Sequence, residues 1–115
     1  MKVIVQNGAN HSLSRVVVER ALAGVPHEWV KNVTQLIISA ETSDFPVATF
    51  HENDCSISIN GPRDTAALPA VLVELLSSLS VIAERGELPS RLGAQVRAEH
   101  VAAANAVLAK AALHP

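Results

Sequence analysis

The side chains that most often bind metals or perform catalysis are few in this sequence and are not grouped. The five histidines are His11, His27, His51, His100 and His114, and no two of them lie three or four residues apart. A helical zinc site needs two histidines one turn apart, so a His-x-x-x-His pair is absent. Segment 51–55 (HENDC) contains several ligand types, but it coincides with an expected hairpin turn, where polar residues are usual. We therefore expect neither a metal nor a cofactor.

Nucleophile and phosphate-binding motifs are also missing. Cys55 is the only cysteine, so the chain forms no internal disulfide, and its alternation with Ile57 and Ile59 predicts a buried side chain on a strand face. No Gly-x-Ser-x-Gly motif occurs, and the glycines are too far apart for a phosphate-binding loop. We expect the serines at 77, 78 and 80 to hydrogen-bond to the preceding turn of their own helix.

Glu74 is the one carboxylate whose position in the sequence suggests a role. It is the only acidic residue in an otherwise apolar stretch, residues 65–83. Buried carboxylates are uncommon unless they are paired or functional. One interpretation places Glu74 on a narrow exposed stripe with Ser77, Ser78 and Arg85. The other makes it a buried carboxylate with a role of its own.

Sequence patterns predict the elements that position these residues. Strands are expected at 2–6, 34–39, 47–51 and 55–60, and helices at 11–23, 65–85 and 90–113, with a short helical turn at 26–31. Residues 41–44 are expected as a loop, 52–54 as the turn of a hairpin, and Gly61-Pro62 as the end of that hairpin. The expected N-caps are Ser12, Asp64 or Thr65, and Ser90, and Gly86 is expected to end the central helix.

The order β-α-β-β-β-α-α predicts a single α+β domain over residues 1–115, with a small mixed sheet of about four strands. The helix at 65–85 is apolar nearly all round, which is typical of a buried central helix. A membrane span is not expected, because its most apolar part, 66–83, contains Pro69, Glu74 and serines. The absence of a long apolar run near residue 1 favours a cytoplasmic location.

Composition excludes two further classes of protein. The chain has 115 residues, of which 49% are hydrophobic and 17% are charged, so it is not a disordered protein. Its formal net charge of −2 argues against an electrostatic partnership with nucleic acid. Aromatic residues are rare, at 3%, so the core must consist of aliphatic side chains.

The layout from residue 12 onward resembles the small bacterial zincin-like metallopeptidase domains. Segment 18–33 (VERALAGVPHEWVKNV) is similar to the first helix of that family and leads to a strand. A hairpin follows, with Phe50 on its first strand and the Ile-x-Ile of residues 57–59 on its second. A proline-containing connection then leads to the helix that carries His-Glu-x-x-His in the family. Here that helix is 71–79 (VLVELLSSL), with Glu74 at the position of the glutamate.

The zinc-binding motif itself is absent from this helix. Alignment on the glutamate places Val73 and Ser77 where the family has its two histidines. Valine cannot bind zinc and a serine hydroxyl binds it poorly, so Glu74 has no zinc-bound water on which to act as a base. The resemblance therefore implies a zincin-like fold without peptidase activity. Its vestigial site comprises Val73, Glu74, Ser77 and His100, with His100 as the preferred third-ligand position.

We accordingly expect a non-catalytic binding or interaction domain, not an enzyme. The resemblance implies that a sheet edge takes up an extended peptide from a peptide or protein partner. Two alternatives stay open: a structural homo-oligomer without a ligand, and an unrecognised enzyme that uses Glu74 with His51 or His100. The last helix favours a homodimer, because apolar residues follow two of its sides. One side carries Ala94, Ala98, Val101, Leu108 and Ala112, and the other carries Val96, Ala103 and Val107.

Overall fold

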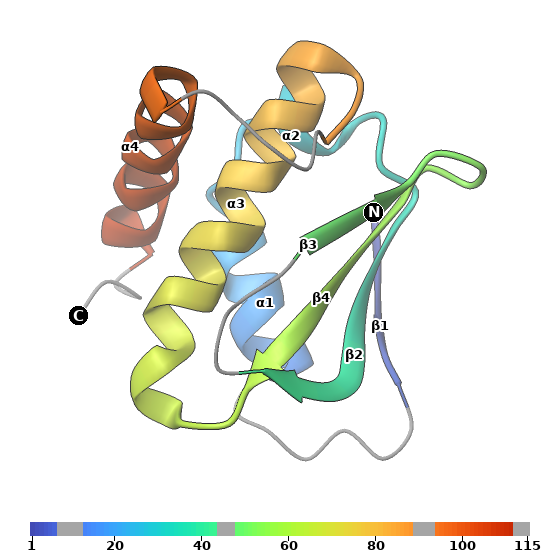
Figure 1. The fold of residues 1–115 in the computed structure, drawn as a ribbon, viewed down its shortest axis with the longest axis vertical. Helices are drawn as coiled ribbons and strands as arrows, with labels where there is room; N and C mark the ends of the chain where they lie inside the picture. Colours follow the sequence, from blue (N-terminus) through green and yellow to red (C-terminus); the bar gives the residue numbers. More distant parts are fainter. Residues whose placement is uncertain (7–12, 44–47, 89–93, 112–115) are drawn as a thin grey trace.

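A computed structural model describes residues 1–6, 13–43, 48–88 and 94–111. The elements are β1 (Lys2–Val5), α1 (Arg15–Leu22), α2 (His27–Val30), β2 (Gln35–Ser43), β3 (Ala48–His51), β4 (Ser56–Pro62), the 3-10 turn η1 (Thr65–Ala67), α3 (Leu68–Arg85) and α4 (Ala94–Lys110). The α+β class and the predicted order of strands and helices are confirmed (Figure 1).

The four strands form one mixed sheet in the order β1-β2-β4-β3. Strand β2 is parallel to both β1 and β4, whereas β3 is antiparallel to β4 and forms the predicted hairpin with it. Val3, Leu36, Ile57 and Phe50 pair in one row across the four strands. Since side chains alternate along a strand, this row points to one face of the sheet. That face carries the core.

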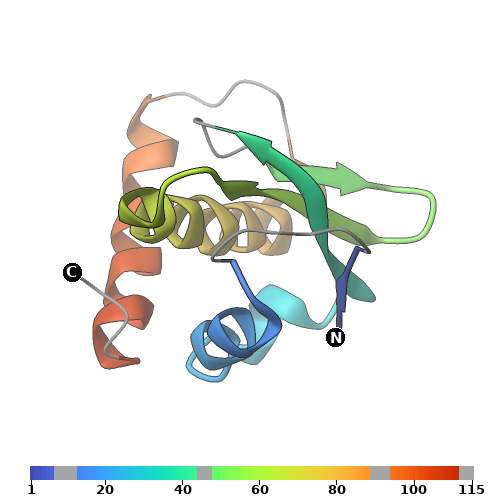
Figure 2. The same ribbon diagram turned by 90° about the horizontal axis from the view of Figure 1, so that it is seen from below.

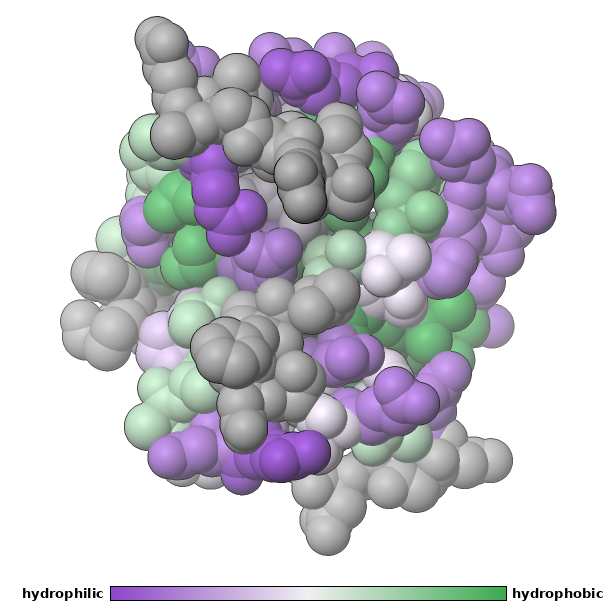
Figure 3. Space-filling model, viewed as in Figure 1, coloured by the Kyte–Doolittle hydropathy of each residue, from purple (hydrophilic) through white to green (hydrophobic). Residues whose placement is uncertain are grey.

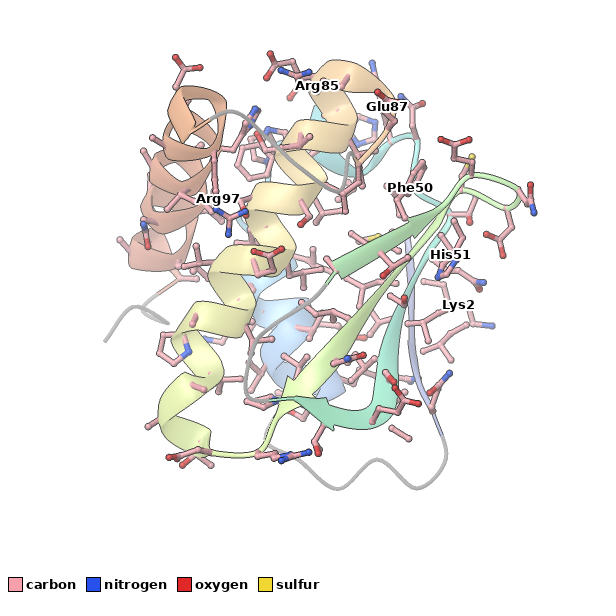
Figure 4. The ribbon with its side chains drawn as sticks, in the orientation of Figure 1. Lys2, Phe50, His51, Arg85, Glu87 and Arg97 are labelled. Carbon is pink, nitrogen blue, oxygen red and sulfur yellow. The ribbon has the colours of Figure 1, made fainter. Side chains whose placement is uncertain are left out.

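The helices in the described part of the chain all lie on this face of the sheet. Helix α3 packs against β4 and β3, α1 packs against β1, and α2 and α4 flank α3. Figure 2 shows these helices together on one side of the strands. The opposite face presents residues such as Ile4, Ile37 and Ser58, and Figure 4 places Lys2 and His51 on this side, away from the helices. On the strand side of the molecule, Figure 3 shows hydrophobic surface bordered by hydrophilic residues.

Helix α3 is the centre of the core, as its apolar pattern predicts. Val71, Leu72 and every residue from 75 to 82 are buried. The segment Thr65–Arg85 is long and apolar enough to cross a membrane, yet 56% of its most apolar window is buried inside the protein. That degree of burial is what a core helix of a globular domain shows.

Helix ends follow the predicted chemistry at two positions and differ at a third. Asp64 caps η1 by accepting a hydrogen bond from the Ala66 amide at 2.9 Å. Gly86 ends α3 with a φ of 74°, a conformation that glycine adopts without a steric penalty. Helix α1, however, is capped by Ser14, whose hydroxyl accepts from the Val17 amide. The predicted caps Ser12 and Ser90 lie outside the described residues.

The expected loop at 41–44 and the expected end of the hairpin at Gly61-Pro62 are both wrong in part. Strand β2 continues to Ser43, and β4 continues to Pro62. The two strands resume pairing at Thr42 and Gly61 after an irregularity that follows Ile38. Strand β2 continues through polar residues because its pairing with β4 extends past the buried part of the sheet. Pro62 is tolerated because the described part of β3 ends its pairing with β4 at Ile59.

Candidate functional site

Glu74 does not lie on an exposed stripe, so that interpretation is wrong. Its carboxylate Oε2 is 3.0 Å from Nη2 of Arg97 on α4, and its side chain is only 19% exposed. Figure 4 shows Arg97 extending from α4 toward α3. The neighbouring Ser77 and Ser78 are buried, and their hydroxyls donate to the Glu74 carbonyl at 3.2 and 2.6 Å. The backward hydrogen bonds predicted for these two serines are therefore confirmed.

His100 occupies a second polar contact between α3 and α4. It is 5% exposed, and its Nδ1 lies 2.8 Å from the Ser80 hydroxyl, which therefore bonds to α4 instead of its own helix. Its Nε2 lies 2.9 Å from Glu84 Oε2, but the geometry is not that of a hydrogen bond. The histidine thus contacts Ser80 and Glu84, not the predicted Glu74 and Ser77.

The four residues of the vestigial site are only partly assembled. Val73, Glu74 and Ser77 lie within one turn or so of α3, and Val73 packs against the core. His100 comes from α4 but points to a later turn of α3. His51, the other suggested partner of Glu74, lies on the open face of the sheet and bonds to Ser58 at 3.1 Å. Glu74 instead contacts Arg97, whose role the sequence analysis missed.

Ser80, His100 and Glu84 combine a hydroxyl, an imidazole and a carboxylate. A nucleophilic serine must be reachable by its substrate and needs nearby donors for the developing oxyanion. Ser80 is 9% exposed and lies between two packed helices. This burial favours a structural role, in which the three side chains fix α4 against α3.

Metal binding is the first point that can be tested. Within residues 1–6, 13–43, 48–88 and 94–111, no three His, Cys, Asp or Glu side chains are placed to hold an ion. We expect purified protein to retain far less than one zinc ion per chain after dialysis, as measured by elemental analysis. Retention of one zinc per chain, lost on His100→Ala, would contradict this expectation and reinstate a site around that histidine.

A pocket of about 520 Å³ lies between the end of α3 and the β3–β4 hairpin. Its wall is formed by Asn32, Phe50, Glu52, Cys55, Ile82, Arg85, Gly86 and Glu87. Figure 4 shows Phe50 on the strand side of this region and Arg85 and Glu87 at the end of the helix. The pocket therefore combines apolar walls with three charged side chains, and it borders an edge strand.

Cys55 lines this pocket but is not placed as predicted. Strand β4 begins at Ser56, and Cys55 precedes it with a φ of 55°, a left-handed conformation that is uncommon for residues other than glycine. Its half-buried thiol donates to the Glu52 carbonyl at 3.8 Å. Ile57 and Ile59 do form the expected buried strand face, but Cys55 belongs to the turn.

The turn that carries Cys55 is fastened to the rest of the sheet by hydrogen bonds from Thr34. The Thr34 hydroxyl donates to the Asp54 carbonyl at 2.7 Å, and its amide donates to the Cys55 carbonyl at 2.8 Å. Asp54 also accepts from the hydroxyl of Ser56 at 2.7 Å and from its amide at 3.2 Å. These contacts hold one wall of the pocket in place.

The hydrogen bond from Ser56 makes a testable pKa prediction. The Ser56 hydroxyl is the main reason that the pKa of Asp54 lies below its ordinary value of 3.8. We expect Ser56→Ala to raise the pKa of Asp54 toward 3.8, as measured by NMR titration of the carboxyl carbon. Ser14→Ala is the control, because the Ser14 hydroxyl bonds to the Val17 amide on α1 and should leave the pKa of Asp54 unchanged.

The lowered pKa of Asp54 also determines the pH range in which this carboxylate stabilises the folded protein. Because the folded-state pKa is lowered, the contribution is fully present above about pH 3.8 and is lost as the pH falls through the folded-state value. The difference in stability between the parent and Ser56→Ala should therefore shrink in strong acid. A difference that grew on acidification would contradict this assignment.

The structure thus defines an α+β domain with a mixed four-stranded sheet, helices on one face and a pocket beside the edge strand β3. Comparison with known protein families, curated proteins and solved structures finds no match for this chain.

Proposed function

We propose that the protein is a non-catalytic binding domain that takes up an extended peptide along the edge strand β3. The observation that carries this proposal is the position of the pocket next to β3, which is paired only with β4 among the described residues. An edge strand presents free backbone donors and acceptors to an added strand, while an adjoining pocket selects its side chains. The zincin-like resemblance supports the same mode of binding.

The contacts of the candidate catalytic groups support the non-catalytic part of the proposal. The Glu74 carboxylate is engaged by Arg97, and the Ser80 hydroxyl and His100 ring are buried between two helices. None of these groups lines the pocket beside β3. Binding at this edge would therefore use the backbone of β3 and the pocket wall.

The test uses a defined probe peptide, acetyl-Thr-Val-norleucine-Val-Thr-amide, added to ¹⁵N-labelled protein. We expect amide shifts in β3 (Ala48–His51), with little change in β1 (Lys2–Val5), the other edge of the sheet. The control peptide carries N-methyl groups on its second and third residues. Because neighbouring N–H groups of a strand point to opposite edges, one of the two lost donors must be a donor that pairs with β3. Equal binding of the control, shifts confined to β1 or α4, or no binding at all would overturn the proposal.

The alternative partner for the same edge is a second copy of this chain. Two β3 strands could pair in a symmetric homodimer, because an unpaired edge is a template for any strand. Light scattering separates the two cases. A mass of 12.1 kDa at all protein concentrations excludes the dimer, whereas about twice that mass, reduced by the probe peptide, assigns both partners to this edge.

A further inference from the structure

We infer that the pocket beside β3 selects a lysine or arginine side chain of the bound peptide. The inference rests on the proposed function and adds to it the chemistry of the recognised residue. The pocket wall carries the carboxylates of Glu52 and Glu87 and the guanidinium of Arg85. Its formal charge is therefore negative, which favours a cationic group over an anionic one.

The end of α3 adds to this negative character. Gly86 lines the pocket and ends the helix, so the last carbonyls of α3 lie beside it. Only the Ile82 carbonyl among them receives a backbone hydrogen bond, from Gly86, within the described residues. A helix C-terminus carries a partial negative charge, which Arg85 in the last turn offsets in part. Arg85 is the one cation among the described residues of the pocket wall, so one negative charge of the two glutamates stays unmatched there.

The apolar part of the wall fits the stem of such a side chain. Phe50 comes from β3 and Ile82 from α3, so each of these elements contributes an apolar side chain to the pocket wall. Lysine and arginine bury their methylene groups against apolar surface while keeping the charged end among polar groups. An aromatic ring also attracts a nearby cation. A volume of about 520 Å³ accommodates one long side chain.

The register of the sheet directs a peptide side chain to this place. Phe50 lies in the row that points toward the helices. In a strand added beside β3, the residue opposite Phe50 points to the same face, and its neighbours point to the open face. One peptide residue in two is thus presented to the pocket side, and the central residue of a five-residue probe can be that one.

The experiment compares three versions of the probe peptide whose central residue is lysine, norleucine or glutamate. We expect the lysine peptide to bind about 3–10-fold more tightly than the norleucine peptide, and the glutamate peptide to bind most weakly. The preference should decrease in high salt, because the pocket is open to solvent. Glu52→Gln combined with Glu87→Gln should abolish the preference, so that the lysine and norleucine peptides bind the variant with equal affinity. Glu19→Gln, an exposed position on α1, is the control and should change neither affinity.

The outcomes separate the two proposals. Equal affinities of the three peptides, with shifts still confined to β3, overturn the cationic pocket and leave strand addition standing. A lysine preference that persists in the double glutamine variant also overturns the pocket assignment. Absence of binding by all three peptides overturns the proposed function and, with it, the selection of a cationic side chain by the pocket.

Discussion

Replacement of Leu75 by alanine should lower the free energy of unfolding by about 2–5 kcal/mol. Leu75 has no exposed surface and lies in the middle of α3, the helix against which the sheet, α2 and α4 pack. Its truncation removes buried methyl groups and leaves a cavity in a core made of rigid aliphatic neighbours. The melting temperature should fall by roughly 10–20 °C. Urea denaturation measures the change directly, with an unchanged m-value if the native state stays compact.

Val16→Ala provides the comparison for a surface position. Val16 is 74% exposed on α1, so its truncation should change stability by less than about 0.5 kcal/mol. Similar effects of the two substitutions would contradict the placement of α3 at the centre of the core.

Replacement of His100 by alanine should have the second-largest effect, about 2–4 kcal/mol. It leaves a cavity between α3 and α4, and it removes the only partner of the buried Ser80 hydroxyl among the described residues. Circular dichroism during urea denaturation would measure the loss. Loss of α4 packing before global unfolding is the expected form of the defect, since this histidine fixes α4 against α3.

Two further substitutions measure how much the contacts of His100 with Ser80 and with Glu84 each contribute to stability. Glu84→Gln changes a carboxylate that is 57% exposed and lies near His100 without a hydrogen bond to it, so the substitution should cost less than about 1 kcal/mol. Ser80→Ala leaves the buried Nδ1 of His100 without this partner and should cost about 1–3 kcal/mol. If His100→Ala costs no more than Glu84→Gln, the buried contact with Ser80 does not hold the two helices together.

The overall fold was predictable because local patterns and the core agree. The apolar run of α3 predicts a buried helix, and Ile57 and Ile59 predict the inner face of β4, which the structure confirms. Asp64 and Gly86 mark helix ends by chemistry that acts within a few residues. Polar residues such as Thr42 gave no strand signal, because strand pairing beyond the core needs no apolar alternation.

The site residues were harder to predict because their contacts join distant parts of the chain. The partner of Glu74 is Arg97, which lies on the next helix, α4. Arg97 has both acidic and basic residues near it in the sequence, so the sequence does not distinguish it as the partner. The pocket combines Asn32, Phe50 and Glu87, which only the folded sheet and helix bring together. Alternation also started the strand one residue too early, at Cys55, because this residue belongs to the turn and has a left-handed conformation.

The strand order also bears on the sequence of events in folding. Strands β3 and β4 are joined by a short turn, so their hairpin can close early with a small loss of chain entropy. In the sequence, β3 lies between β2 and β4, and α1 and α2 lie between β1 and β2. The pairing of β2 with β4 and its pairing with β1 therefore each close a longer loop than the hairpin does. Non-local contacts of this kind slow folding. The rate-limiting event is therefore expected to be the insertion of β2 between its two parallel neighbours, at the centre of the sheet and not at its edges.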